Sequence, residues 1–335
     1  MVPNVAVVGA TGAVGELIRQ VLIERDFPIK SIRFLASAKS AGKPISFRGQ
    51  NHAVELIRPE AFADIDLVLS STPAGVSREF SPIAAKAGAI VVDNSSAWRM
   101  DPEVPLVVPE VNARVLERIP KGIVANPNCV AIPLCVALQP LHQLVGIKRV
   151  VVATYQSSSG KGAKGLQDFN AQLTAFAKGG PVPAPTAHRG QLAGNVITLD
   201  WTLDPNGYTE EENKVINETR KILDEPNLGI SVTCVRVPVR VSHCEAVNVE
   251  FERPITVEQA RGALSSAPGV VLMDETKGDV PQPIHAEGRD EVFVGRVRRD
   301  PSQPNALNLW VVADNLRKGA ASNAVQIAEV LFKVS

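Results

Sequence analysis

One of the four cysteines is placed as a catalytic nucleophile would be. Cys129 ends the segment ANPNC and precedes the apolar run 130–138, which predicts that its thiol lies near a helix start. The helix dipole and the free N–H groups there lower a thiol pKa and favour the thiolate, and the same N–H groups can form an oxyanion hole. A buried cysteine is more often a small hydrophobe, and we expect that role of Cys135, Cys234 and Cys244.

A glycine-rich turn near the N-terminus could hold the pyrophosphate of a dinucleotide. The segment GATGAVG, residues 9–15, follows a short apolar run and leads into a helical pattern. Glycines let the backbone approach a phosphate closely, and a helix N-terminus offers free N–H groups. The spacing G-x-x-G-x-x-G also suits a tight turn without a ligand, but its position directly after the first strand favours cofactor binding. The expected contacts are Gly9, Thr11, Gly12, Ala13, Val14 and Gly15.

The end of the second expected strand indicates which dinucleotide is bound. An NAD site usually has an acidic residue there, which accepts a hydrogen bond from the ribose 2′-hydroxyl. Residues 35–43 read LASAKSAGK and contain no carboxylate. Ser37, Lys39 and Ser40 could hold a 2′-phosphate, with Lys43 nearby; an ordinary solvated loop is the alternative. The sequence therefore predicts NADP.

Up to residue 128, the chain alternates between strand and helix. Short apolar runs at 4–8, 31–35, 65–69 and 89–92 are typical of buried parallel strands. Between the first two, apolar residues from Val14 to Leu22 form one helical stripe. This rhythm predicts an α/β protein with an N-terminal Rossmann-like dinucleotide-binding domain.

After Cys129, helices no longer separate the strands regularly. Long apolar or alternating runs at 147–154, 230–241 and 246–251 indicate a second, α+β domain with a mixed or largely antiparallel sheet. The breaker-rich segment 179–194 is expected to be a long surface loop. The C-terminal helix is expected to pack back on the first domain, with Ala321, Val325, Ala328 and Phe332 on one face.

Composition excludes several classes of protein. Among 335 residues, 35 basic and 35 acidic side chains give a net charge of zero, so we expect no nucleic-acid partner. Four cysteines without a C-x-x-C pair predict neither a disulfide framework nor a metal site. No apolar stretch approaches the ~20 residues that span a bilayer, and the first residues read as a strand rather than a secretory signal. We expect a soluble, cytoplasmic protein without a membrane partner.

Several segments resemble the aspartate-β-semialdehyde dehydrogenase family, in the order that the family has them. They are GATGAVG with ASAKSAGK, NSSAWRMD, NPNC, TYQSSSG, EENKVINETRKI, RVPVRVSHCEAV and WVVADNLRKGAA. The resemblance extends from Gly9 to Ala321. It implies reduction of β-aspartyl phosphate by NADPH to aspartate semialdehyde and phosphate through a Cys129 thioester, in the pathway to lysine and diaminopimelate, threonine, methionine and isoleucine.

The resemblance also implies roles for further residues. His243 matches the family's catalytic acid/base and Gln156 the glutamine that orients the substrate. Arg236 corresponds to the arginine that binds the substrate carboxylate, for which a planar fork is suited. Glu211 is expected near the substrate amino group; Lys214, Arg99 and Asn128 are expected at the phosphate, and Thr72, Ser159, Gly160 and Asn315 at the cofactor.

Without the resemblance, Glu211 and Lys214 would be read as an exposed i,i+3 ion pair on a helix that Thr209 and Glu212 begin with a capping box. A histidine such as His243 would more often be a surface or core residue. The resemblance implies a homodimer. It also divides the chain into an NADP-binding domain, 1–128 plus 312–335, and a catalytic and dimerisation domain, 129–311.

The spacing of Arg236 and His243 sets a geometric condition. Side chains alternate along a strand, so residues seven apart point to opposite faces of a regular strand. If both contact one substrate, the strand must bend or end between them, and Pro238 is poorly suited to a central strand. We therefore predict an irregularity there.

The sequence departs from the family at several positions. Val130 to Pro133 replaces the usual residues after NPNC, and Pro133 would remove an early helix hydrogen bond and tilt the helix. Lys161 stands in the SGAG-like stretch, Cys244 follows the histidine in place of serine, and the segment 186–199 matches poorly. These changes affect loop and cofactor geometry and leave the proposed chemical groups in place.

Three alternative functions follow from the same residues. N-acetyl-glutamyl-phosphate reductase shares the nucleotide domain and the thiol chemistry, and an acyl-CoA reductase of the same fold acts on a thioester. A catalytically silent NADP-binding homologue is the alternative of a different class. The residues from Glu211 to Lys214 and from Arg236 to His243 favour aspartyl phosphate, and retention of Cys129 argues against a silent homologue.

Overall fold

The computed structural model describes residues 2–334, and the chain divides into two compact units. The first contains the residues up to Asn128 and those from Ala320 onward; the second is Cys129–Gly319. The sequence placed the return to the first domain at residue 312. In the structure it falls at Ala320, because residues 306–313 form a strand of the second unit's sheet.

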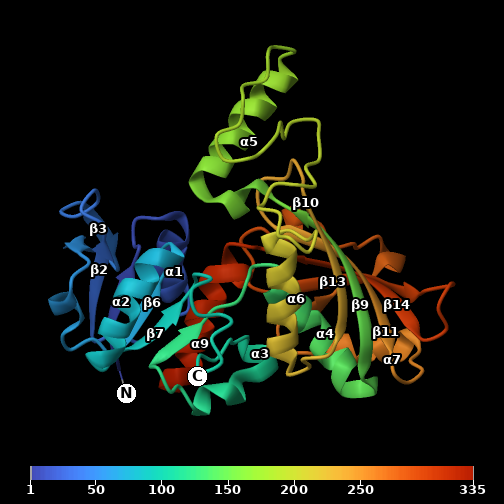
Figure 1. Ribbon diagram of the computed structural model, residues 1–335, viewed down its shortest axis with the longest axis horizontal. Helices are drawn as coiled ribbons and strands as arrows, with labels where there is room; N and C mark the ends of the chain where they lie inside the picture. The colour runs from blue at the N-terminus through green and yellow to red at the C-terminus, as the bar shows by residue number, and fades with distance from the viewer. Residues whose placement is uncertain (1, 335) are drawn as a thin grey trace. The chain divides into compact units, whose positions relative to one another are not determined.

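The first unit is built on a six-stranded parallel sheet with the order β5-β2-β1-β6-β7-β8 (Figure 1). Its strands are β1 (Asn4–Val8), β2 (Ser31–Ala36), β5 (Glu55–Leu56), β6 (Leu67–Ser70), β7 (Ile90–Asp93) and β8 (Ile123–Ala125). The chain adds β2 on one side of β1 and β6 on the other, so the order of the strands reverses between β1 and β6. An open parallel sheet has a crevice at such a point, at the carboxyl ends of its strands. The Rossmann-like fold is therefore confirmed.

Other elements of this unit connect or cover the parallel sheet. The helices are α1 (Ala13–Glu24), α2 (Ala74–Lys86), α3 (Pro109–Asn112) and α9 (Ser322–Phe332), with short 3₁₀ turns at Pro59–Phe62 and Ala113–Glu117. A two-stranded hairpin is formed by β3 (Pro44–Phe47) and β4 (Gln50–Ala53).

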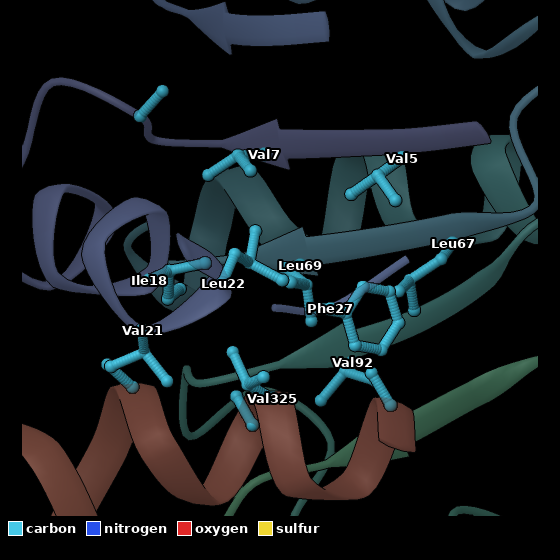
Figure 2. Close-up of a cluster of buried hydrophobic side chains, with 14 of the residues drawn as sticks. Val5, Val7, Ile18, Val21, Leu22, Phe27, Leu67, Leu69, Val92 and Val325 are labelled. Atoms are coloured by element: carbon cyan, nitrogen blue, oxygen red, sulfur yellow. The ribbon is translucent and has the colours of Figure 1, made fainter. Parts of the chain in front are cut away.

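The core of this unit lies between the sheet and helices α1 and α9. Figure 2 shows side chains from all three meeting, among them Val7, Leu22, Leu69 and Val325. The apolar stripe that the sequence predicted for α1 is buried here, and the C-terminal helix packs on this sheet as expected. Continuous apolar strands are required because both faces of a parallel sheet are covered.

The second unit is built on a mixed six-stranded sheet with the order β10-β9-β11-β14-β13-β12. Its strands are β9 (Ile147–Gln156), β10 (Gly229–Arg236), β11 (His243–Phe251), β12 (Val270–Leu272), β13 (Val292–Arg299) and β14 (Ala306–Ala313). Its helices are α4 (Ala131–Val145), α5 (Gly162–Ala177), α6 (Glu210–Leu223), α7 (Val257–Ser265) and α8 (Pro283–Ala286). Short 3₁₀ turns lie at Ser158–Lys161 and Glu275–Lys277, and a π-helical turn at Arg317–Ala321 leads into α9. The predicted second α+β domain with a mixed sheet is confirmed.

The predicted irregularity between Arg236 and His243 is confirmed. β10 ends at Arg236 and β11 begins at His243. Between them, the Val239 N–H bonds to the Val237 carbonyl at 2.8 Å, and Ser242 adopts φ +75°. The two side chains are therefore not bound by the alternation of a single strand.

Two expectations about local structure need correction. Segment 179–194 is irregular, but it is not simply a surface loop, because His188 and Leu192 are buried. Side chains of α5 anchor it: Asp168 accepts from the Thr186 and Ala187 N–H groups, and Gln172 from the Leu192 N–H. Pro133 is the third residue of α4, where an N–H has no helical partner, so it costs no helix hydrogen bond.

No helix among residues 2–334 has both the length and the apolar character needed to cross a membrane.

Candidate active site

Cys129 is half-buried and lies two residues before helix α4, as the sequence predicted. The backbone of Gly319 passes directly beside it. A Cβ atom at Gly319 would lie 2.9 Å from the Cβ and 3.2 Å from the Cα of Cys129, so a side chain there would force one of the two segments to shift. The turn that contains Gly319 therefore packs tightly against Cys129 because residue 319 is glycine.

The other three cysteines are buried, as expected of structural residues. Burial raises the pKa of Cys244 to about 12 and also raises those of Cys135 and Cys234. Cys234 Sγ is 3.7 Å from the Gln156 amide nitrogen, at the end of β9.

His243 is held in one orientation by the turn that follows β9. The Ser157 backbone N–H donates to Nδ1 at 3.0 Å. Because Nδ1 accepts this bond, the neutral ring carries its proton on Nε2. Nε2 is buried and has no partner among the described residues, and a Cβ at Gly160 would lie 3.4 Å from it. Burial, and secondarily the charge of Arg236, lower the pKa of His243 well below its usual value.

Gln156, Glu211 and Arg236 gather at the same end of the sheet. Gln156 and Arg236 are aligned across the parallel strands β9 and β10. The Gln156 amide lies 3.5 Å from Glu211 Oε1. Arg236 Nη1 donates to the backbone carbonyl of Ser157, and the backbone N–H of the same residue donates to His243. A Cβ at Gly160 would come within 3.0 Å of this Nη1, so Gly160 leaves both side chains room.

Helix α6 presents Glu211 in its first turn. The predicted capping box is present: the Thr209 hydroxyl accepts from the Glu212 N–H, and the Glu212 carboxylate accepts from the Thr209 N–H. Glu212 also accepts from the Cys234 N–H, which ties the helix to β10. Lys214 lies 3.6 Å from Glu211, at the edge of this group. The ion pair that the sequence offered as an alternative is therefore real, but its glutamate is buried.

Asn315 organises the residues around His243. Its Oδ1 accepts from the Ser157 hydroxyl at 3.1 Å, the Ser159 hydroxyl at 2.9 Å and the Ser242 N–H at 3.0 Å. The sequence proposed Ser159, Gly160 and Asn315 as cofactor contacts; the structure places all three beside the histidine. Their cofactor role stays a prediction.

The remaining proposed substrate residues lie in the first unit. Arg99 is buried and donates to the backbone carbonyls of Asn94 and Asn126. Asn128, also buried, ends this unit directly before Cys129. Their assignment to a phosphate site stays a prediction.

The glycine turn after β1 is packed so closely that only glycine fits at two of its positions. Gly9 has φ +80°, and a Cβ there would meet the Ser71 carbonyl oxygen at 2.1 Å and the Thr72 side chain at 3.3 Å. The turn after β1 therefore abuts the segment after β6, at the point where the sheet order reverses. A Cβ at Gly15 would lie 2.2 Å from the Gly9 carbonyl oxygen, so α1 can start this close only with glycine.

The other proposed cofactor residues surround this turn. Gly12 is the N-cap of α1, and Ala13 and Val14 are its first residues. Thr11 donates to Ser40 at 3.1 Å, which links the turn with the segment after β2. Ser37 and Lys39 are exposed in that segment. These positions suit binding of a phosphate-bearing ligand at a helix N-terminus.

Sequence reasoning missed three residues that organise the site. Ser157 acts through its backbone, which no side-chain motif reports. His188 comes from the segment 179–194, which was expected to be a surface loop, and Asp200 lies six residues after that segment; both belong to the Arg236 network. The burial of His188 could not be foreseen from a segment rich in glycine and proline, and no motif pointed to Asp200.

The chain has a Rossmann-like unit and a mixed α+β unit, and the second unit has a thiol at a helix start and an oriented histidine. This combination is typical of dinucleotide-dependent thiol enzymes. Residues 4–119 match the family described as "Semialdehyde dehydrogenase, NAD binding domain", and residues 138–318 match "Semialdehyde dehydrogenase, dimerisation domain". The chain therefore belongs to the semialdehyde dehydrogenase family.

Individual relatives are similar over the whole chain. The aspartate-semialdehyde dehydrogenase of Aquifex aeolicus is 49% identical over 333 residues, 98% of both chains. The crystal structure of aspartate semialdehyde dehydrogenase II complexed with ASA from Vibrio cholerae is 43% identical, with a TM-score of 0.96 over 100% of this chain and 99% of that one. The enzyme of Candida albicans with NADP is 25% identical, with a TM-score of 0.77 over 99% of each chain.

Proposed function

We propose that this chain is an aspartate-semialdehyde dehydrogenase, which converts β-aspartyl phosphate and NADPH to aspartate semialdehyde, phosphate and NADP. The observation that carries the proposal is the second unit's site: Cys129 at the start of α4, with His243 fixed as an Nε2–H donor. The relatives with this printed name match the chain from end to end. The resemblance found in the sequence supports the same activity.

Cys129 is the nucleophile in this proposal. Its thiolate attacks the acyl carbon, the carbon–oxygen bond to phosphate breaks, and phosphate leaves with the electron pair. His243 donates from Nε2 to the carbonyl oxygen as negative charge develops on it. When the aldehyde forms, the carbon–sulfur bond breaks and the thiolate is regenerated.

Substrate recognition needs charges of both signs. Arg236 binds the α-carboxylate and Glu211 the α-ammonium group, since they are buried opposite charges beside Gln156. Gln156 orients the acyl group. We assign Lys214, Arg99 and Asn128 to phosphate.

The cofactor we propose is NADP, whose reduced form, NADPH, would supply the hydride that reduces the thioester and would become NADP⁺. The residues fit it: Gly12 begins α1, whose N-terminus offers free N–H groups to a phosphate, and no carboxylate directly follows β2 to repel a 2′-phosphate. Lys39 and Ser40 would hold that phosphate, and the Candida albicans relative bears NADP in its printed title.

We also propose that the chain forms a homodimer in the cytoplasm. The match to a dimerisation domain over residues 138–318 supports pairing through the second unit. Cytoplasmic location rests on the sequence alone and stays a prediction.

The test is phosphate-dependent formation of NADPH from aspartate semialdehyde and NADP⁺. We expect turnover by the wild type and a loss of about 10⁴-fold or more in Cys129→Ala, as for removal of a covalent nucleophile. Cys135→Ala, which removes a buried thiol from the same helix, is the control and should keep the rate.

Two results would contradict the proposal. Binding of NADPH without turnover of any aldehyde would indicate a silent homologue. Preference for N-acetyl-glutamate semialdehyde or for an acyl-CoA product would indicate one of the related reductases.

A further inference from the structure

A buried carboxylate from the segment between α5 and α6 holds Arg236. Asp200 is fully buried, and its Oδ2 accepts from Arg236 Nε at 2.9 Å. The same oxygen is 3.0 Å from His188 Nδ1, and Oδ1 accepts from the Arg189 N–H at 2.9 Å. Burial alone would raise the pKa of Asp200, but the bonds from His188, Arg189 and Arg236 hold it well below its usual range. The carboxylate is thus charged at neutral pH.

Together, these contacts fix the guanidinium group of Arg236 on three sides. Nε is bound by Asp200, Nη1 by the Ser157 carbonyl, and one face lies over the Trp201 ring at 4.6 Å from its centroid. No residue among 2–334 accepts a hydrogen bond from Nη2. The end of the fork formed by Nη2 and the second N–H of Nη1 is therefore left for an external carboxylate.

The anchor extends beyond Asp200 to the turn after β9. His188 Nε2 is 2.7 Å from the Ser158 hydroxyl, which donates to the Gly165 carbonyl. Serine, histidine and aspartate in this order have the composition of a nucleophilic triad. All three are buried and the hydroxyl is already committed, so they act as a support rather than as a second catalytic centre. Ser158 directly follows Ser157, whose carbonyl accepts from Arg236 Nη1. The chain of contacts from Ser158 through His188 to Asp200 therefore adjoins both groups that bind Arg236.

We propose that Asp200 is a positioning residue that sets Arg236 to bind the α-carboxylate of the substrate. The inference rests on the proposed function, and it adds a residue of the segment between α5 and α6 to the recognition of the substrate. Asp200 does not contact the substrate; it acts by fixing the direction of the guanidinium fork.

The test compares two aldehydes in wild type and Asp200→Asn. Aspartate semialdehyde carries the α-carboxylate, and 3-aminopropanal is the same molecule without it. In the variant we expect kcat/KM for aspartate semialdehyde to fall about 10- to 100-fold, as when one partner of a buried charge pair is removed. For 3-aminopropanal it should change less than about threefold, because no carboxylate has to be met. For aspartate semialdehyde, the loss in kcat/KM should come from a higher KM, and kcat should change little.

Asp168→Asn is the matched control. It loosens the same segment, because Asp168 accepts from the Thr186 and Ala187 N–H groups, but it does not touch Arg236. It should lower the melting temperature and leave the preference between the two aldehydes unchanged. An equal loss on both aldehydes in Asp200→Asn would overturn the proposal, since it would show a general structural role.

Two further outcomes are separable. Should Asp200→Asn fail to fold, Ser158→Ala cuts the support without changing a charge, and an unchanged preference there overturns the proposal. Should the wild type fail to turn over aspartate semialdehyde, the proposed function itself is wrong, and this inference falls with it.

Discussion

At the scale of residues, the chemistry depends on where His243 carries its proton. A backbone N–H cannot accept, so the bond from Ser157 to Nδ1 excludes a proton there. The neutral ring is then a donor at Nε2 and has no lone pair to offer on that side. In the mechanism that we propose, His243 would therefore stabilise a developing oxyanion rather than deprotonate Cys129, whose thiolate the start of helix α4 would favour.

We predict that His243 stays neutral, as the Nε2–H tautomer, well below pH 6.5, because burial and then Arg236 lower its pKa. ¹⁵N NMR of histidine-labelled protein, with His243→Gln to assign the signal, checks the tautomer. The acid limb of kcat/KM should likewise lie well below pH 6.5. Since the unfolded chain regains the ordinary pKa, it binds the proton first, so this group's contribution to stability is present above pH 6.5 and is lost as pH falls.

His52 is half-exposed and lies in the first unit, so its signal in the same spectra is a comparison from outside the candidate site. A His243 signal that shows Nδ1–H, or one that titrates at its ordinary value, would contradict the assigned role. The histidine would then have to be considered as the base that deprotonates Cys129.

At the scale of elements, the π-helical turn at Arg317–Ala321 packs against Cys129 through Gly319. We predict that Gly319→Ala lowers kcat about 10- to 100-fold, because its Cβ would displace Cys129 and misalign the attack. Steady-state kinetics and NADPH binding are the measurements. Cofactor affinity should be kept.

Gly262→Ala is the control for this substitution. Gly262 lies within helix α7, and no atom lies within 4 Å of an added Cβ. Alanine there should raise stability by about 0.5–1 kcal/mol through helix propensity and leave the rate unchanged. An unchanged kcat in Gly319→Ala would show that the thiol tolerates the shift and would refute a positioning role.

The segment after β2 should determine which dinucleotide is used. We predict that Ser37→Asp lowers kcat/KM for NADP⁺ on the order of 100-fold and for NAD⁺ only slightly, because a carboxylate repels a 2′-phosphate and accepts from a 2′-hydroxyl. Ser31→Asp makes the same change at the opposite end of β2 and should alter neither. Equal kcat/KM for the two cofactors in the wild type would remove the prediction.

Periodicity predicted the elements well, because strands and helices repeat their burial along the chain. Four strands of the first sheet (β1, β2, β6 and β7), the α6 capping box and the break after Arg236 follow from local residue types. The short edge strands β5 and β8 were not predicted, because two or three residues are too few to show a pattern. The contact of Arg236 with Asp200 joins positions 36 residues apart through a segment with no period, so no pattern reports it. The Ser157 lock on His243 involves a backbone N–H, which every residue but proline has.

At the scale of the whole molecule, the second unit's sheet has two different faces. Along β9, Val150, Val152 and Thr154 are buried, while Tyr155 on the other face is 39% exposed. Helices α4, α6 and α7 pack on this sheet, and the Tyr155 ring instead meets Trp310 of β14 at 5.4 Å. Paired aromatic rings on a partly open sheet face are typical of a protein interface.

We predict that the chain pairs with a second copy through this face. Wild type should have twice the chain mass of 35.7 kDa in multi-angle light scattering, and Tyr155→Asp should shift it toward the mass of one chain. Placing a charge at the centre of an apolar contact leaves it desolvated without a partner, which costs several kcal/mol of association free energy.

Val330→Asp is the matched control, because Val330 is 41% exposed but lies on α9 in the first unit. If Tyr155→Asp stayed dimeric while the wild type was dimeric, pairing would have to use another surface of the second unit, and the exposed Phe176 of α5 would be the next residue to change. A monomeric wild type would refute pairing altogether, since the matched dimerisation domain would then be present without its function.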